Sequence, residues 1–213
     1  MKSIILALTL LFISCSSNSD GRFVIEGQTS ELDGKYYYLL DELKVLDSAK
    51  IENGRYRFEG LIDSLAPLRN ISSTDCSSPL ITTRFTYVVL EEGTIHVKED
   101  DNSPTGGLVV YGTDANDALN NFAVKGSQIR EKLKFATSKE ERTAIMEEYS
   151  TLVEKTIENN LDNYAGVQLL SVSGSRFSNM QKTKYLNRLS KEMKKTRAAK
   201  ALIREQGTQT KQK

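Results

Sequence analysis

The spacing of apolar residues changes near residue 112, and this change constrains the fold more than any other feature of the chain. Up to Tyr111, short runs rich in β-branched and aromatic residues alternate with glycine-containing turns, as in strands. After Asp114, apolar residues recur at steps of three and four, which is typical of amphipathic helices. The pattern predicts an α+β fold: an N-terminal antiparallel β-sandwich or partly open barrel, followed by a C-terminal helical segment.

The predicted β domain covers residues 22–112, and its clearest unit is centred on Asn53-Gly54. This dipeptide tolerates the positive φ angles of a type I′ turn, so Ile51 and Tyr56 should face each other across a hairpin. Past the turn, three residues should supply the buried face of the strand: Tyr56, Phe58 and Leu61. Further strands are predicted near residues 23–25, 36–40, 68–72, 85–90, 94–98 and 108–111.

The helical segment should cover residues 113–206 and precede a polar tail at 207–213. Asp114 is expected to cap the first helix. Ser138 and Ser178 each stand three residues before Glu or Gln, which predicts two capping boxes. Inward positions should be Leu119, Phe122, Ile129 and Leu133, then Ile145, Tyr149, Leu152 and Ile157, then Met180, Tyr185, Leu186, Leu189 and Met193. Gly207 should end the last helix.

The first residues have the composition of an export signal. Lys2 precedes an apolar run over residues 4–13, which is too short to span a bilayer but fits the core of a signal peptide. Ser14-Cys15 and the polar residues after it resemble the lipobox of bacterial lipoproteins, although Phe12 stands where Leu is commoner. We therefore expect residues 1–14 to be a signal peptide, Cys15 to carry the lipid and residues 15–21 to form a tether. The alternative is an ordinary secretory signal that happens to contain this cysteine.

The lipid, palmitate or a similar acyl chain, would be the only membrane anchor. No later segment approaches the ~20 apolar residues that a spanning helix needs. The protein is thus expected in the bacterial cell envelope, anchored in the outer membrane and facing the periplasm. Surface-exported lipoproteins tend to carry an acidic cluster after the cysteine, whereas here only Asp20 follows.

Candidate reactive residues are few. His96 is the only histidine, and alternation along its strand should turn it toward water, opposite Ile95 and Val97. With Cys15 acylated, Cys76 is the only other cysteine, so no internal disulfide or Cys-x-x-Cys chemistry is expected. The acidic run at residues 99–102 lacks the spacing of a calcium loop and should be a solvated turn. We expect no catalytic residue, no metal site and no cofactor.

Charge is unevenly distributed along the chain. Residues 1–124 hold 10 basic and 18 acidic residues, whereas residues 125–213 hold 19 and 10. Such asymmetry can mark a segment that binds nucleic acid or a membrane surface. Export argues against nucleic acid, which leaves the membrane surface as the expected partner of the basic segment.

Several motifs stand in an order that is similar to the domain of unknown function 4369. They are Phe23-x-Ile25-x-Gly27, Asp47-Ser48-Ala49-x-Ile51-x-Asn53-Gly54, Arg55-Tyr56-x-Phe58-x-Gly60, Leu90-Glu91-x-Gly93-x-Ile95, Gly112-Thr113 and Asn116. The resemblance covers residues 22–112 well and the helices more loosely. It implies a module that follows a lipoprotein signal in Bacteroidetes-type bacteria, usually in front of a thioredoxin-like domain. This chain stops near Gly207, about where that domain would begin, so the redox activity of longer relatives is not carried over.

Two functions are compatible with these observations. The favoured one is a non-catalytic, lipid-anchored interaction or binding module with a protein partner in the envelope. The alternative is the accessory or targeting half of a thiol-redox system, acting with a separate thioredoxin-like protein.

Overall fold

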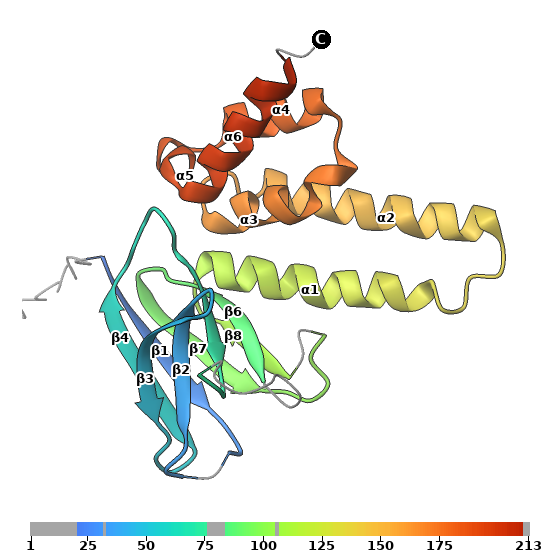
Figure 1. The fold of residues 1–213 in the computed structure, drawn as a ribbon. Helices are drawn as coiled ribbons and strands as arrows, with labels where there is room; N and C mark the ends of the chain where they lie inside the picture. The colour runs from blue at the N-terminus through green and yellow to red at the C-terminus, as the bar shows by residue number, and fades with distance from the viewer. Residues whose placement is uncertain (1–20, 32, 76–83, 105–106, 211–213) are drawn as a thin grey trace, which may run out of the picture.

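The computed structural model describes residues 21–31, 33–75, 84–104 and 107–210. It consists of strands in two sheets followed by helices (Figure 1), which confirms the predicted α+β fold. The expected signal peptide, Cys15 and Cys76 lie outside the described residues.

The strands form two four-stranded sheets with the orders β4-β1-β7-β8 and β3-β2-β5-β6. Their bounds are β1 Arg22–Gln28, β2 Tyr36–Asp41, β3 Lys44–Lys50, β4 Arg55–Leu61, β5 Leu68–Ser72, β6 Phe85–Val89, β7 Gly93–Glu99 and β8 Leu108–Tyr111. Alternate residues of both sheets, including Ile25, Phe58, Ile71 and Val88, share one buried core. The sheets stay separate, so the β domain is a sandwich and not a closed barrel.

One strand pair departs from the predicted antiparallel pattern. Strand β1 pairs with β4 in antiparallel but with β7 in parallel orientation, so that Ile25 lies beside Ile95. The chain passes through the whole of the other sheet, β2, β3, β5 and β6, between these two strands. A connection of that length lets a strand return in the same direction, which a tight turn cannot do.

The Asn53-Gly54 turn is present, but the hairpin that it joins is short. Asn53 and Gly54 have φ angles of 52° and 67°, as a type I′ turn requires. Beyond the pair Glu52–Arg55, the strands diverge into different sheets, so the expected pairing of Ile51 with Tyr56 is wrong. Leu61 is 70% exposed rather than buried, because it has the opposite parity to Tyr56 and Phe58 along β4.

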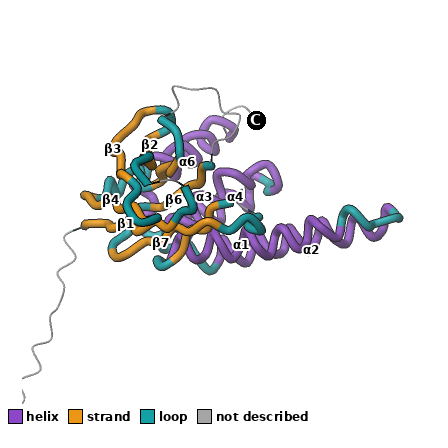
Figure 2. The backbone as a smooth tube through the Cα atoms, turned by 90° about the horizontal axis from the view of Figure 1, so that it is seen from below, coloured by secondary structure: helices purple, strands orange, loops and turns teal. Residues whose placement is uncertain are grey.

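The helices form layers above one end of the sandwich (Figure 1). They are α1 Asp114–Lys132, α2 Lys139–Glu158, α3 Tyr164–Ser173, a 3-10 turn Gly174–Arg176, α4 Asn179–Arg188, α5 Lys191–Lys195 and α6 Arg197–Thr210. Helices α1 and α2 run side by side and extend away from the strands (Figures 1 and 2). The hydrophobic helix α3 lies in the middle of a second core that also contains Val153, Ile157, Leu186 and Leu189.

Local capping chemistry decides where the helices begin. Both capping boxes, Ser138 with Glu141 and Ser178 with Gln181, are confirmed. The first helix differs: its N-cap is Thr113, in extended conformation, and Asp114 is already helical.

The last predicted helix is divided into α4, α5 and α6. Ser190 and Thr196 interrupt it, and the hydroxyl of each accepts a hydrogen bond from the backbone N–H three residues later. Met180, expected inside, is 81% exposed at the first turn of α4. Gly207 does not end α6, which continues to Thr210, so the predicted end of the last helix is wrong.

A candidate binding groove at the edge of strand β6

Of the candidate reactive residues, the structure describes His96 and the acidic run at residues 99–102, whereas Cys76 lies outside the described residues. His96 lies on the open face of its sheet, opposite Ile95 and Val97, as predicted. Its Nδ1 is 3.9 Å from a carboxylate oxygen of Glu26, and its ring is 5.2 Å from that of Tyr111. In the described part of the chain, no three His, Cys, Asp or Glu residues gather as metal ligands would.

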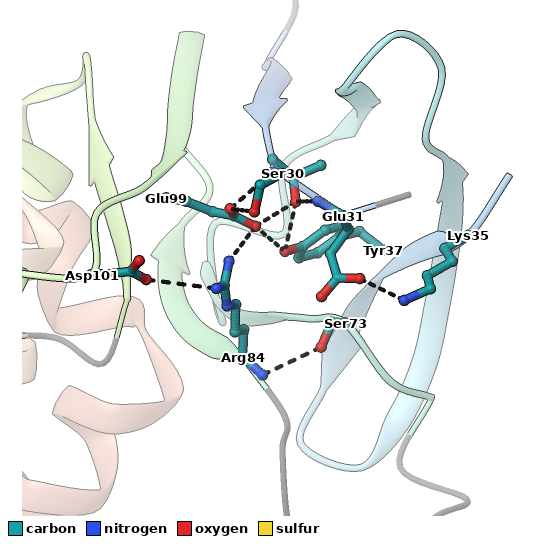
Figure 3. A network of polar contacts seen from close by, with 9 residues as sticks. Ser30, Glu31, Lys35, Tyr37, Ser73, Arg84, Glu99 and Asp101 are labelled. Carbon is teal, nitrogen blue, oxygen red and sulfur yellow. Dashed lines mark hydrogen bonds and ion pairs between the residues drawn. The ribbon is translucent and has the colours of Figure 1, made fainter. Parts of the chain in front are cut away.

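A partly buried carboxylate at one end of the sandwich ties both sheets together (Figure 3). The Oε1 of Glu99 lies 2.6 Å from Nη1 of Arg84, accepts a hydrogen bond from the Tyr37 hydroxyl at 3.3 Å, and accepts another from the Thr29 hydroxyl. Its Oε2 accepts from the backbone N–H and the hydroxyl of Ser30 at 2.9 and 2.6 Å. We call these five residues the Glu99 cluster. It fixes Arg84, and therefore the start of β6, to the other sheet.

Hydrogen bonding controls the ionisation of Glu99. Burial alone would raise the pKa of this carboxyl, but donors from Arg84, Ser30 and Thr29 outweigh burial and lower the pKa to about 2. The same contact also stabilises the charged form of Arg84, because the hydrogen bond to Glu99 raises the pKa of the guanidinium. In the acidic run at residues 99–102, the prediction of a solvated turn is wrong for Glu99, which ends β7 and is held by the Glu99 cluster. The residues after it do form a turn, in which Asp100 accepts a hydrogen bond from the backbone N–H of Asn102 and Asp101 lies 3.6 Å from Arg84.

Glu99→Gln should therefore destabilise the protein in a pH-dependent way. Folding lowers the pKa of Glu99 from 4.5, so its charge stabilises the fold above that pH and the stabilisation is lost as the pH falls toward 2. Urea unfolding should show a loss of about 2 kcal/mol at pH 7 that shrinks at pH 3. Glu147→Gln, on the exposed face of α2, is the control and should have little effect. A loss that does not vary with pH would mean that charge is not the cause.

The other end of β6 is fixed by an amide from α1. Oδ1 of Asn116 accepts a hydrogen bond from the N–H of Val89 at 2.9 Å, and its Nδ2 donates to the Val89 carbonyl at 2.8 Å. The same Nδ2 lies 2.7 Å from the hydroxyl of Thr113, and Asn116 is 3% exposed. One side chain thus makes the two hydrogen bonds that a neighbouring strand would make with Val89.

Between these two fixed ends, the outer edge of β6 is open. Antiparallel strands direct the backbone groups of alternate residues toward the same partner. Hydrogen bonds from Ser73 to Arg84 and from Leu90 to Pro67 show that even-numbered residues of this strand face β5. The N–H and C=O groups of Phe85 and Tyr87 therefore point away from β5. Among the described residues, no backbone or side-chain partner is found for them.

An apolar groove of about 350 Å³ runs beside this edge. It is bounded by the strands β6 and β8 and by the helices α1 and α3. Leu108 and Val110 of β8 form its floor. Three apolar residues at its rim are well exposed: Phe85 by 51%, Tyr87 by 55% and Val172 by 65%. Oδ1 of Asn120, also in the lining, is buried without a hydrogen-bond partner among the described residues. We call this space the β6 groove. Its size and mainly apolar lining with a few amides are typical of ligand sites.

The model of the domain of unknown function DUF4369 matches residues 20–119. That segment of the chain belongs to the DUF4369 family. No curated protein and no solved structure matches the chain. The DUF4369 region contains all strands described here and the first turns of α1, so both ends of β6 are fixed within it. Helix α3, which forms one wall of the β6 groove, follows the DUF4369 region. In the described residues, none of the helices is both long and apolar enough to cross a membrane.

Sequence reasoning did not identify the β6 groove. The signal within the DUF4369 region was the alternation Phe85-Thr86-Tyr87-Val88, with large aromatic residues on the side opposite to the core. Asn116, a residue of the DUF4369-like motifs, is the second signal. A buried amide at the start of a helix has to satisfy four hydrogen-bonding sites, and here two of its hydrogen bonds go to a strand edge.

Proposed function

We propose that this protein is a lipid-anchored, non-catalytic module of the bacterial envelope that binds an extended, apolar segment of another envelope protein in the β6 groove. The observation that carries the proposal is the open edge of β6, where the backbone groups of Phe85 and Tyr87 face the groove. Strand addition at such an edge supplies hydrogen bonds that do not depend on sequence, and adjacent pockets select the side chains.

The groove chemistry favours a peptide over a purely apolar ligand. An added strand would pair with Phe85 and Tyr87 and direct alternate side chains toward Leu108 and Val172. A polar group of the same segment could donate to Oδ1 of Asn120, which is costly to leave without a partner. An aliphatic ligand would satisfy none of these polar groups.

The Ser14-Cys15 sequence supports the anchored part of the proposal. The short tether would keep the protein close to the membrane, where partners also attached to the envelope are concentrated. If the protein is instead the accessory half of a thiol-redox system, a segment of the separate thioredoxin-like protein would occupy the groove. This alternative stays a prediction.

A peptide library with apolar residues at alternate positions tests the groove directly. We expect members to bind the mature protein and Val172→Glu to weaken that binding at least about tenfold, because the carboxylate would be desolvated in an apolar groove. Val124→Glu is the matched control, since Val124 is 38% exposed on α1 and does not line the groove. The proposal fails if no peptide binds, or if the two valine variants bind as the wild type does.

A further inference from the structure

The charge of the molecule is divided between two regions of the fold. Residues 179–210, which form α4, α5 and α6, contain nine basic residues against Glu192 and Glu205. Residues 21–178 contain 17 basic and 25 acidic residues. We call residues 179–210 the basic layer. It lies on the side of α2 and α3 opposite to α1 (Figure 1), and the start of α6 contacts the loop between β4 and β5.

Many charges of the basic layer are exposed to solvent. They include Lys184, Lys191, Lys195, Lys200 and Arg204. Two other basic residues make ion pairs with neighbouring elements: Arg188 with Glu158 at 3.1 Å and Arg197 with Asp63 at 3.6 Å. These pairs hold the layer in place, while the lysines face outward with their charges available to an anionic surface.

The layer also lies close to the place where the tether enters the fold. The Gly21 carbonyl accepts a hydrogen bond from Ile62 at 2.8 Å, and the N–H of Arg197 donates to the Leu65 carbonyl at 2.7 Å. Because Leu65 follows Ile62 by only three positions, Gly21 and Arg197 are at most roughly 20 Å apart. Cys15 precedes Gly21 by six residues, a reach of about 20 Å when fully extended.

We propose that the basic layer rests on an anionic lipid surface and orients the protein there. The inference rests on the proposed lipid anchor, which brings Gly21, and with it α5 and the start of α6, near the membrane. The negative remainder of the molecule is repelled by the same surface. In this orientation α1, which forms one wall of the β6 groove, lies on the side of α2 and α3 away from the lipid (Figure 1).

Vesicle binding without the acyl chain separates this contact from the anchor. The mature chain from residue 15 with Cys15→Ser is mixed with vesicles of phosphatidylcholine, with or without phosphatidylglycerol. We expect sedimentation with the anionic vesicles only, and release by moderate salt. The triple variant Lys191→Glu, Lys195→Glu and Lys200→Glu should bind at least about tenfold more weakly. The control triple Lys44→Glu, Lys125→Glu and Lys139→Glu makes the same change in net charge at exposed positions elsewhere and should bind nearly as the wild type does.

Three results would overturn the inference: equal binding to neutral vesicles, equal losses in both triple variants, or no binding to anionic vesicles. If the proposed lipid anchor is wrong, the result is different: the wild type takes up no labelled fatty acid, but vesicle binding by the Cys15→Ser chain is unchanged. Failure of the β6 groove is also distinct, because peptide binding is measured without vesicles.

Discussion

Gly27→Ala is expected to prevent folding, or to destabilise the protein by at least about 3 kcal/mol. A Cβ atom at residue 27 would lie 1.9 Å from Cζ of Tyr56 and within 2.3 Å of two further ring atoms. The ring cannot move aside easily, because Tyr56 is 4% exposed and stacks on Tyr37 at a centroid distance of 4.2 Å. Tyr37 in turn donates to Glu99, so a displaced ring would also disturb the Glu99 cluster.

Circular dichroism and urea unfolding of the variant would measure this loss. Gly207→Ala is the control, since nothing lies within 4 Å of a Cβ atom there and the residue is in α6. That change should be neutral or stabilising, because alanine favours a helix over glycine by roughly 1 kcal/mol. If Gly27→Ala unfolded at the same urea concentration as the wild type, the close packing of Tyr56 on β1 would be incorrect.

Cys15→Ser should abolish attachment of fatty acid altogether. Each buried methylene contributes about 0.8 kcal/mol, so two or three acyl chains hold a protein firmly where one chain holds it marginally. We expect the wild type to incorporate labelled palmitate and to remain in the membrane fraction. The variant should carry no label, and should be found either as a released mature protein or as an unprocessed precursor.

Cys76→Ser is the matched control for this experiment. It removes the other cysteine of the chain and should change neither labelling nor fractionation. Wild-type protein that takes up no fatty acid and fractionates as soluble would contradict the anchor. Thiol-dependent turnover that Cys76→Ser abolishes would instead contradict the proposal of a non-catalytic module.

Turns and helix starts could be predicted from the sequence where a few neighbouring residues determine the local backbone conformation. The turn at Asn53-Gly54 is of this kind, because these two residues tolerate the positive φ angles that it requires. The capping boxes at Ser138 and Ser178 are too, because the first free N–H groups of each helix find acceptors within four residues. The change from period two to period three or four placed the boundary between strands and helices close to Thr113. The α+β fold followed from that boundary.

Features that depend on distant partners were not predictable in the same way. The parallel pairing of β1 with β7 joins residues about 70 positions apart, and no local pattern specifies it. Ser190 and Thr196 divide the last helix, although serine and threonine also occur inside helices such as α2. The β6 groove depends on Asn116 reaching Val89 from another element, and therefore emerges only when the sandwich and α1 are packed together.

Amide hydrogen exchange along β6, resolved by residue, tests the central claim most directly. In the free protein, we expect slow exchange at Thr86 and Val88, which face β5, and at Val89, which donates to Asn116. Phe85 and Tyr87 should exchange fast, and should slow when a library peptide binds. Slow exchange at Phe85 and Tyr87 in the free protein, or unchanged exchange in the peptide complex, would show that this edge is not the binding site.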